Sequence, residues 1–83
     1  MTSVRRPITV ARAEALFTSG VPTGVPLTRT QLEVVVSTAV RIRGSVRACA
    51  AEMAAAYGEY PEAAASRMRW ALRTVELADR RRP

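Results

Sequence analysis

The sequence contains no histidine and no lysine, and among its 83 residues it has one cysteine, Cys49, and one aspartate, Asp79. Without histidine, and with a single thiol, the chain lacks the parts of a zinc site, a serine triad or a cysteine–histidine pair. Glu52, Glu59 and Glu62 are close in sequence, but they flank an expected turn, which they solvate rather than act as an acid–base pair. We therefore expect neither an enzyme nor a cofactor or metal site.

The single cysteine also excludes an intrachain disulfide, so a reducing cytoplasm is the expected location. Long apolar runs are absent as well. The longest uncharged run, residues 15–28, contains two prolines and is shorter than the ~20 apolar residues that span a bilayer. No apolar segment follows residues 1–6, so neither a signal peptide nor a membrane partner is expected.

Because lysine is missing, all thirteen basic residues are arginine, and the net charge is +6. Five of these arginines lie near the ends, at positions 5, 6, 80, 81 and 82. Without them, eight arginines stand against seven acidic residues, so the body is nearly neutral. The basic charge resides in an expected mobile arm (residues 1–8) and tail (residues 80–83). Such ends suit contact with phosphates, and equally serve only to solvate the chain.

Large side chains are scarce. Fifteen alanines stand against one phenylalanine, one tryptophan and two tyrosines. Alanine favours helix and lets helices approach closely, but each alanine buries little area. A domain of this size buries only about 60–65% of the surface of its unfolded chain, so a partner or a second copy would supply missing burial.

What the sequence does contain is a set of helix signals typical of a small all-α domain over residues 9–79. Thr28 and Gln31 form a capping box at the start of the second helix, and Pro61 suits the first position of the fourth. Thr9 is expected to cap the first helix and Gly20 to end it, with an extended linker before Thr28. These signals predict a bundle of four short helices at residues 9–19, 28–43, 45–57 and 61–79.

Gly44 leaves two interpretations open. The apolar spacing continues through it in a heptad rhythm, which indicates one long helix. That helix would point Arg43 and Arg47 into its apolar arc, which is costly unless both side chains snorkel. A break at Gly44, with Ser45 capping a new helix, avoids the conflict and is favoured. Gly58 is then expected to end the third helix in a left-handed conformation.

Residues 49–73 resemble a helix-turn-helix. Small and apolar positions carry the pattern: Met53, Ala54, Tyr57 and Gly58 before the turn and, with one extra turn residue, Tyr60, Ala65 and Met68 after it. The resemblance implies that the fourth helix lies in a DNA groove. Arg67 would then reach guanine edges, and Arg69 and Arg73 would reach phosphates. The expected DNA-binding residues are Ser66, Arg67, Arg69 and Arg73, and a plain structural hairpin is the alternative.

Four apolar residues are candidates for an interface: Val34, Val36, Val40 and Trp70. The side of the second helix that carries Val36 and Val40 would form a homodimer. Trp70 either covers the flank of the core or, with Val34, anchors another protein. Cys49 falls among core positions and is expected to be an inert, buried thiol.

The sequence thus supports two functions. The first is a small DNA-binding regulatory or accessory protein that acts as a dimer on double-stranded DNA. The second is a protein–protein interaction module, an adaptor or inhibitor, with no role on nucleic acid.

Overall fold

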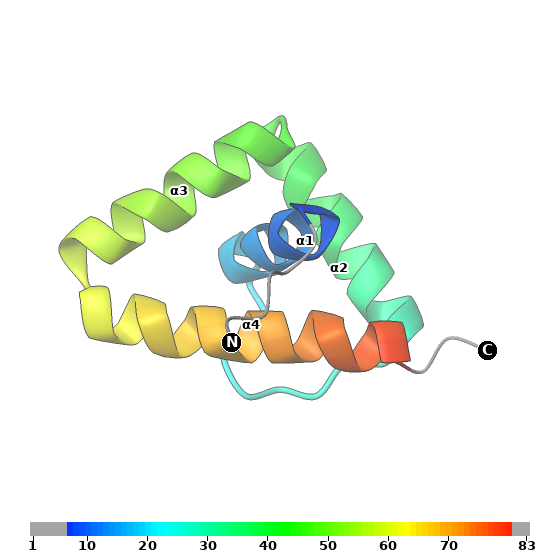
Figure 1. Cartoon of the computed structure of the whole chain (residues 1–83). Helices are drawn as coiled ribbons and strands as arrows, with labels where there is room; N and C mark the ends of the chain where they lie inside the picture. Colours follow the sequence, from blue (N-terminus) through cyan, green and yellow to red (C-terminus); the bar gives the residue numbers. More distant parts are fainter. Residues whose placement is uncertain (1–6, 81–83) are drawn as a thin grey trace.

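The computed structural model describes residues 7–80, and in that range it contains four helices and no strand (Figure 1). The predicted all-α bundle is therefore confirmed. Residues 1–6 and 81–83, which make up most of the expected basic arm and tail, lie outside the described residues. The helices are α1 (Pro7–Thr18), α2 (Arg29–Arg43), α3 (Val46–Glu59) and α4 (Pro61–Arg80).

Helix α1 is the centre of the bundle. Figure 1 shows it almost end-on, framed by the other three helices, and it contacts each of them. Because α1 has neighbours on several sides, it is buried at Ala13, Leu16 and Phe17. The main core joins these to side chains of α2 and α4; its buried members are Ala13, Leu16, Phe17, Leu32, Ala64, Met68, Ala71, Val75 and Ala78.

Helix α2 begins with the predicted capping box. Thr28 Oγ1 accepts a hydrogen bond of 3.1 Å from the Gln31 N–H, and Gln31 Oε1 accepts one of 2.9 Å from the Thr28 N–H. These two bonds satisfy backbone donors that a helix start leaves unpaired. The second helix thus begins within one residue of its expected start.

The predicted break at Gly44 is also confirmed. Gly44 adopts φ 101°, and its N–H donates to the Val40 carbonyl at 2.8 Å, which ends α2. Ser45 then caps α3 by accepting a bond of 3.0 Å from the Ala48 N–H. A left-handed residue followed by an N-cap changes the direction of the chain, so α2 and α3 are separate helices.

The end of α3 differs from the expectation. Gly58 lies inside α3 and does not have positive φ, so the prediction of a left-handed cap there is wrong. The chain turns instead at Tyr60, whose N–H closes α3 on Ala56 and whose carbonyl accepts from the Ala64 N–H of α4. Pro61 explains this position, because a proline excludes helical dihedrals at the residue before it and favours the first position of a helix.

The bounds of the first helix also differ from the expected ones. It begins at Pro7 rather than after a Thr9 cap, and Thr9 is buried within it. At the other end it stops at Thr18, before Gly20. The hydroxyls of Thr18 and Ser19 turn back to the carbonyls of Ala15 and Leu16, at 2.9 and 2.6 Å.

Two glycines give a matched test of the α2–α3 break. We expect Gly44→Ala to lower the free energy of unfolding by about 1–2 kcal/mol, because a Cβ is strained at left-handed φ. No atom lies within 4 Å of that Cβ, so the loss would come from the backbone alone. Gly58→Ala, also in open space but inside a helix, is expected to gain about 0.5–1 kcal/mol. Urea unfolding followed by circular dichroism measures both; equal effects would contradict the assignment.

Candidate functional site

The α3–α4 hairpin lacks the turn of a standard helix-turn-helix. That motif joins its helices with three or four residues, whereas Tyr60 is the single non-helical residue between α3 and α4. Ala54 is exposed rather than packed against the second helix, and Tyr60 is 64% exposed. The two helices meet at Tyr60 and diverge from it (Figure 1). The arrangement is that of a structural helical hairpin.

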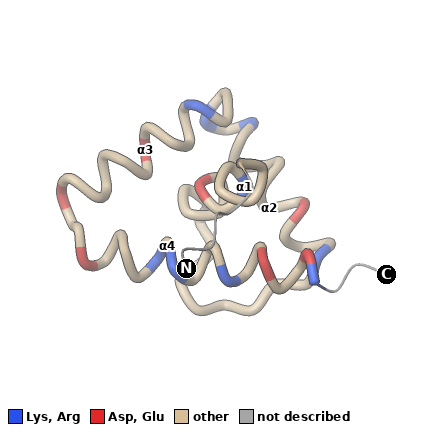
Figure 2. The backbone as a smooth tube through the Cα atoms, viewed as in Figure 1, with Lys and Arg blue, Asp and Glu red and all other residues tan. Residues whose placement is uncertain are grey.

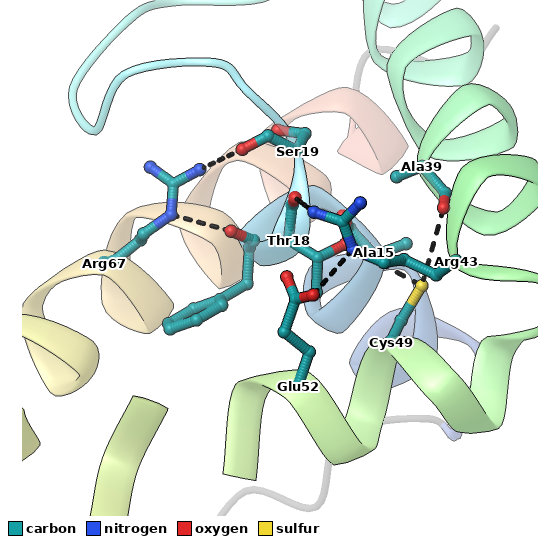
Figure 3. A network of polar contacts seen from close by, with 9 residues as sticks. Ala15, Thr18, Ser19, Ala39, Arg43, Cys49, Glu52 and Arg67 are labelled. Atoms are coloured by element: carbon teal, nitrogen blue, oxygen red, sulfur yellow. Dashed lines mark hydrogen bonds and ion pairs between the residues drawn. The ribbon is translucent and has the colours of Figure 1, made fainter. Parts of the chain in front are cut away.

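Arg67 is the predicted base-reading residue, but its guanidinium is engaged inside the fold. Its Nε donates to the Phe17 carbonyl at 2.7 Å and its Nη2 to the Ser19 carbonyl at 2.9 Å; Figure 3 shows the reach to Ser19. Its Nη1 donates to Thr23 Oγ1 at 2.9 Å. The carbonyls at a helix C-terminus have no partner within the helix, and Arg67 supplies one from α4.

Two aromatic rings enclose the same guanidinium. The Arg67 Cζ lies 5.6 Å from the centroid of Phe17 and 5.0 Å from that of Trp70, which is the distance range of cation–π attraction. Partial burial disfavours the charged form and lowers the pKa of Arg67. The assignment of Arg67 to guanine edges is therefore corrected, because its donors face α1 and the linker (residues 19–28).

The other candidate DNA-binding residues lie on the outside. Ser66, Arg69 and Arg73 are exposed on α4. Within the described part of the chain, neither of these arginines has an ion pair or a side-chain hydrogen bond. Figure 2 shows basic and acidic positions interspersed along α4, with other basic positions at the α2–α3 junction. The structure thus separates Arg67 from Arg69 and Arg73 rather than joining them in one basic surface.

Three of the four predicted interface residues pack within the chain. Val36 and Val40 contact a second small cluster of buried residues, formed by Ala15, Ala39 and Cys49. Trp70 packs against the main core, and its Nε1 donates to the Val25 carbonyl at 3.2 Å. Val36 and Val40 are half-buried within the chain, and a dimer through this side of α2 stays a prediction. Of the four, Val34 alone is exposed, at 59%.

The exposed side of α2 borders an apolar groove. The groove lies between α2 and the linker and has a volume of about 550 Å³. Its polar lining comes from Thr18, Ser19, Thr38 and Arg43. Ile42, which the sequence places at the edge of the apolar arc, is 67% exposed here. The apolar lining includes Val21, Val25, Leu27, Val34, Val35 and Ile42.

Both walls of this groove are fixed by contacts with the rest of the fold. On the linker side, Leu27 packs on the main core, while Trp70 and Arg67 bind Val25 and Thr23 from α4. On the helix side, Leu32 and Ala39 anchor α2. The groove is therefore preformed, because both of its walls are fixed by contacts within the fold.

Arg43 closes one end of the groove. Its Nη2 donates to the Thr18 carbonyl at 2.8 Å, and its Nε pairs with Glu52 at 2.8 Å (Figure 3). The break at Gly44 lets the side chain turn toward the end of α1, which resolves the burial conflict of a continuous helix. Arg41 and Arg47, on either side of the same junction, are exposed.

Cys49 is buried, as predicted, with its Sγ 3.7 Å from Thr18 Oγ1 and 3.9 Å from the Ala39 carbonyl. Residues 7–80 hold no group of three or more side chains suited to a metal ion. Over the same residues, no helix has the length and apolar character required to cross a bilayer. Comparison with known proteins gives no match: no family model, curated protein or solved structure matches this chain.

The capping role of Arg67 makes a stability prediction. We expect Arg67→Met to lower the free energy of unfolding by about 1–3 kcal/mol, because it keeps the apolar stem but leaves the partly buried carbonyls of Phe17 and Ser19 without their donor. Arg69→Met, two residues away and exposed, is the control and should change stability by less than about 0.5 kcal/mol. Urea unfolding measures both. Equal losses would assign Arg67 to the solvent-facing surface.

Proposed function

We propose that the protein is an interaction module that binds an apolar helical segment of another protein in the groove between the linker and α2. The observation that carries the proposal is the exposure of Val34 and Ile42, at 59% and 67%, along a groove whose walls are fixed. Exposed apolar patches bordered by polar residues are typical of interaction surfaces.

The spacing of the exposed residues suits a helix as the ligand. Val34, Thr38 and Ile42 follow one another at four-residue intervals, so they lie along one side of α2. Recognition of an amphipathic helix uses anchors at this same spacing on the ligand. Val25 and Leu27 of the linker form the opposite wall, so an inserted apolar side chain contacts both.

The energy available is adequate for a modest affinity. Burying a valine or isoleucine fully contributes about 1.5–3 kcal/mol relative to leaving it in water. Val34 and Ile42 are each more than half exposed, so covering both contributes about 2–4 kcal/mol before the rest of the interface is counted. A partner that also fills the groove adds to this.

Site-specific photocrosslinking tests the proposal. With p-benzoylphenylalanine at position 34 or 42, in cells that make the protein, we expect a discrete protein adduct that survives nuclease treatment. The same probe at exposed position 69 on α4 should give none. Adding Ile42→Asp to the position 34 probe should remove the adduct, since a charge in the groove is unfavourable. Identical patterns from positions 34 and 69 would rule the groove out.

We propose duplex DNA as a second candidate ligand, because Arg69 and Arg73 are exposed one turn apart on α4 without partners among the described residues. On this proposal both arginines contact phosphates, and Ser66 lies beside them. The basic ends of the sequence would add contacts of the same kind. Arg67 has no part in it, since its removal would disturb the fold.

The DNA proposal makes a quantitative prediction. Titrating pooled genomic duplex fragments over a salt series gives a log–log slope, to which each phosphate contact contributes about −0.9. Arg69→Ala with Arg73→Ala should reduce the magnitude of that slope by about 1.8. Arg41→Ala, at the far junction, should leave it unchanged. Absence of any binding at about 50 mM salt would exclude this candidate.

A further inference from the structure

We infer that the partner of the groove is an amphipathic helix that carries carboxylates beside its apolar face. The inference rests on the proposed function, because it names the partner of the same groove. It is drawn from the positive charges around the groove. A partner helix with neutral or basic residues beside its apolar face would not complement these charges.

At the α2–α3 end of the groove, the charged side chains that have no ion-pair partner among residues 7–80 are arginines. Arg43 is the sole charged residue in the groove lining, and it pairs with Glu52. Arg41 and Arg47 are exposed and have no partner among residues 7–80. Figure 2 shows this group of basic positions at the α2–α3 junction.

Helix dipoles do not neutralise this excess. The C-terminus of α2 contributes about half a negative charge at the junction, and the N-terminus of α3 contributes about half a positive charge. The two nearly cancel, so Arg41 and Arg47 leave a local charge close to two positive units. A partner that brings carboxylates to this end would meet complementary charge.

The positions of these residues along α2 place the positive charge next to the exposed apolar side chains. Arg41 follows Val34 by seven residues, or two turns, so both lie on the same side of the helix. Arg47 adjoins Val46, which is 46% exposed at the start of α3. An occupant lying along Val34 and Ile42 therefore passes Arg41, and Arg47 lies just beyond, at the start of α3. The distance from Val34 to Ile42 is about 12 Å along the axis, so a little more than two turns of partner helix cover it.

A second copy that docks through its own groove brings no carboxylate from the lining of that groove, because that lining contains no acidic residue. On α2 the acidic residue is Glu33, near the opposite end, where it already pairs with Arg29 at 3.7 Å. With the two α2 helices parallel, packing through this surface would bring Arg41 of one copy toward Arg41 of the other, and like charges at an interface are unfavourable. The charge pattern favours a different, acidic partner.

A displayed peptide library tests the inference without knowledge of the natural partner. The library consists of helices with leucine fixed on one face and with the flanking positions randomised among glutamate, glutamine and lysine. Selection on the full chain should enrich glutamate over lysine by about tenfold at flanking positions, the ratio expected from two exposed ion pairs. Arg41→Glu with Arg47→Glu should reverse the preference toward lysine.

The remaining outcomes separate this inference from the proposed function. Binders that depend on Ile42 but show no charge preference would overturn the inference and leave the groove as a helix site. Failure to select any binder, or binders unaffected by Ile42→Asp, would overturn the proposed function as well. Sedimentation equilibrium measures the oligomeric state of the wild type and of Ile42→Asp. A wild-type dimer that becomes a monomer in Ile42→Asp would show that a second copy occupies the groove, and would overturn the acidic partner.

Discussion

The fold depends on how the C-terminus of the central helix α1 is satisfied. The last turn of α1 contains no basic residue of its own, so its last carbonyls need donors from elsewhere. Two arginines from other helices supply the donors: Arg43 of α2 binds the Thr18 carbonyl, and Arg67 of α4 binds the Phe17 carbonyl. Hydrogen bonds from charged donors contribute about 1.5–3 kcal/mol each, less where water competes. In an alanine-rich bundle with few large side chains, these bonds are a substantial share of what fixes the helices relative to one another.

The same contacts determine where the surface remains open. Arg67 and Trp70 hold the linker on α4 through Thr23 and Val25, so the linker does not fold down over α2. Helix α2 contributes only Leu32 and Ala39 to the fully buried set. Its outer side, with Val34 and Ile42, is consequently uncovered. The groove is therefore a consequence of how the linker is held, since a linker held on α2 instead would have filled it.

Local signals explain why the helices were predictable. The Thr28–Gln31 box, the Gly44–Ser45 junction and Pro61 each act within a few residues, and each operates in the structure as the sequence indicates. The Thr9 cap was wrong, because α1 already includes Pro7, and Thr9 is buried within the helix. The Gly58 prediction was wrong because Pro61 disfavours helical dihedrals at the residue before it, Tyr60, and α3 therefore ends there rather than at Gly58.

The role of Arg67 was not predictable in the same way, because its partners are 44 to 50 residues away in sequence. One signal did exist: the first helix ends without a basic residue or a positive-φ glycine, so its carbonyls needed donors from elsewhere. Likewise, the apolar arc of the second helix includes Ile42, because an arc shows which residues share a side of a helix but not how far a neighbouring element covers them.

The use of arginines inside the fold also bears on function. An arginine that caps a helix is held by several bonds, and moving it to a phosphate would leave those carbonyls without donors. Arg43 and Arg67 are thus unsuited to nucleic acid, although by residue type they are the side chains a DNA-binding surface would use. Among residues 7–80, the exposed arginines outside these caps lie in two separate groups, one on α4 and one at the α2–α3 junction (Figure 2). Of these two groups, the junction group is the one that adjoins the apolar groove. A site that offers both an apolar surface and fixed charge can select its partner by shape and by charge. This combination is why the groove, rather than α4, is the better supported site of function.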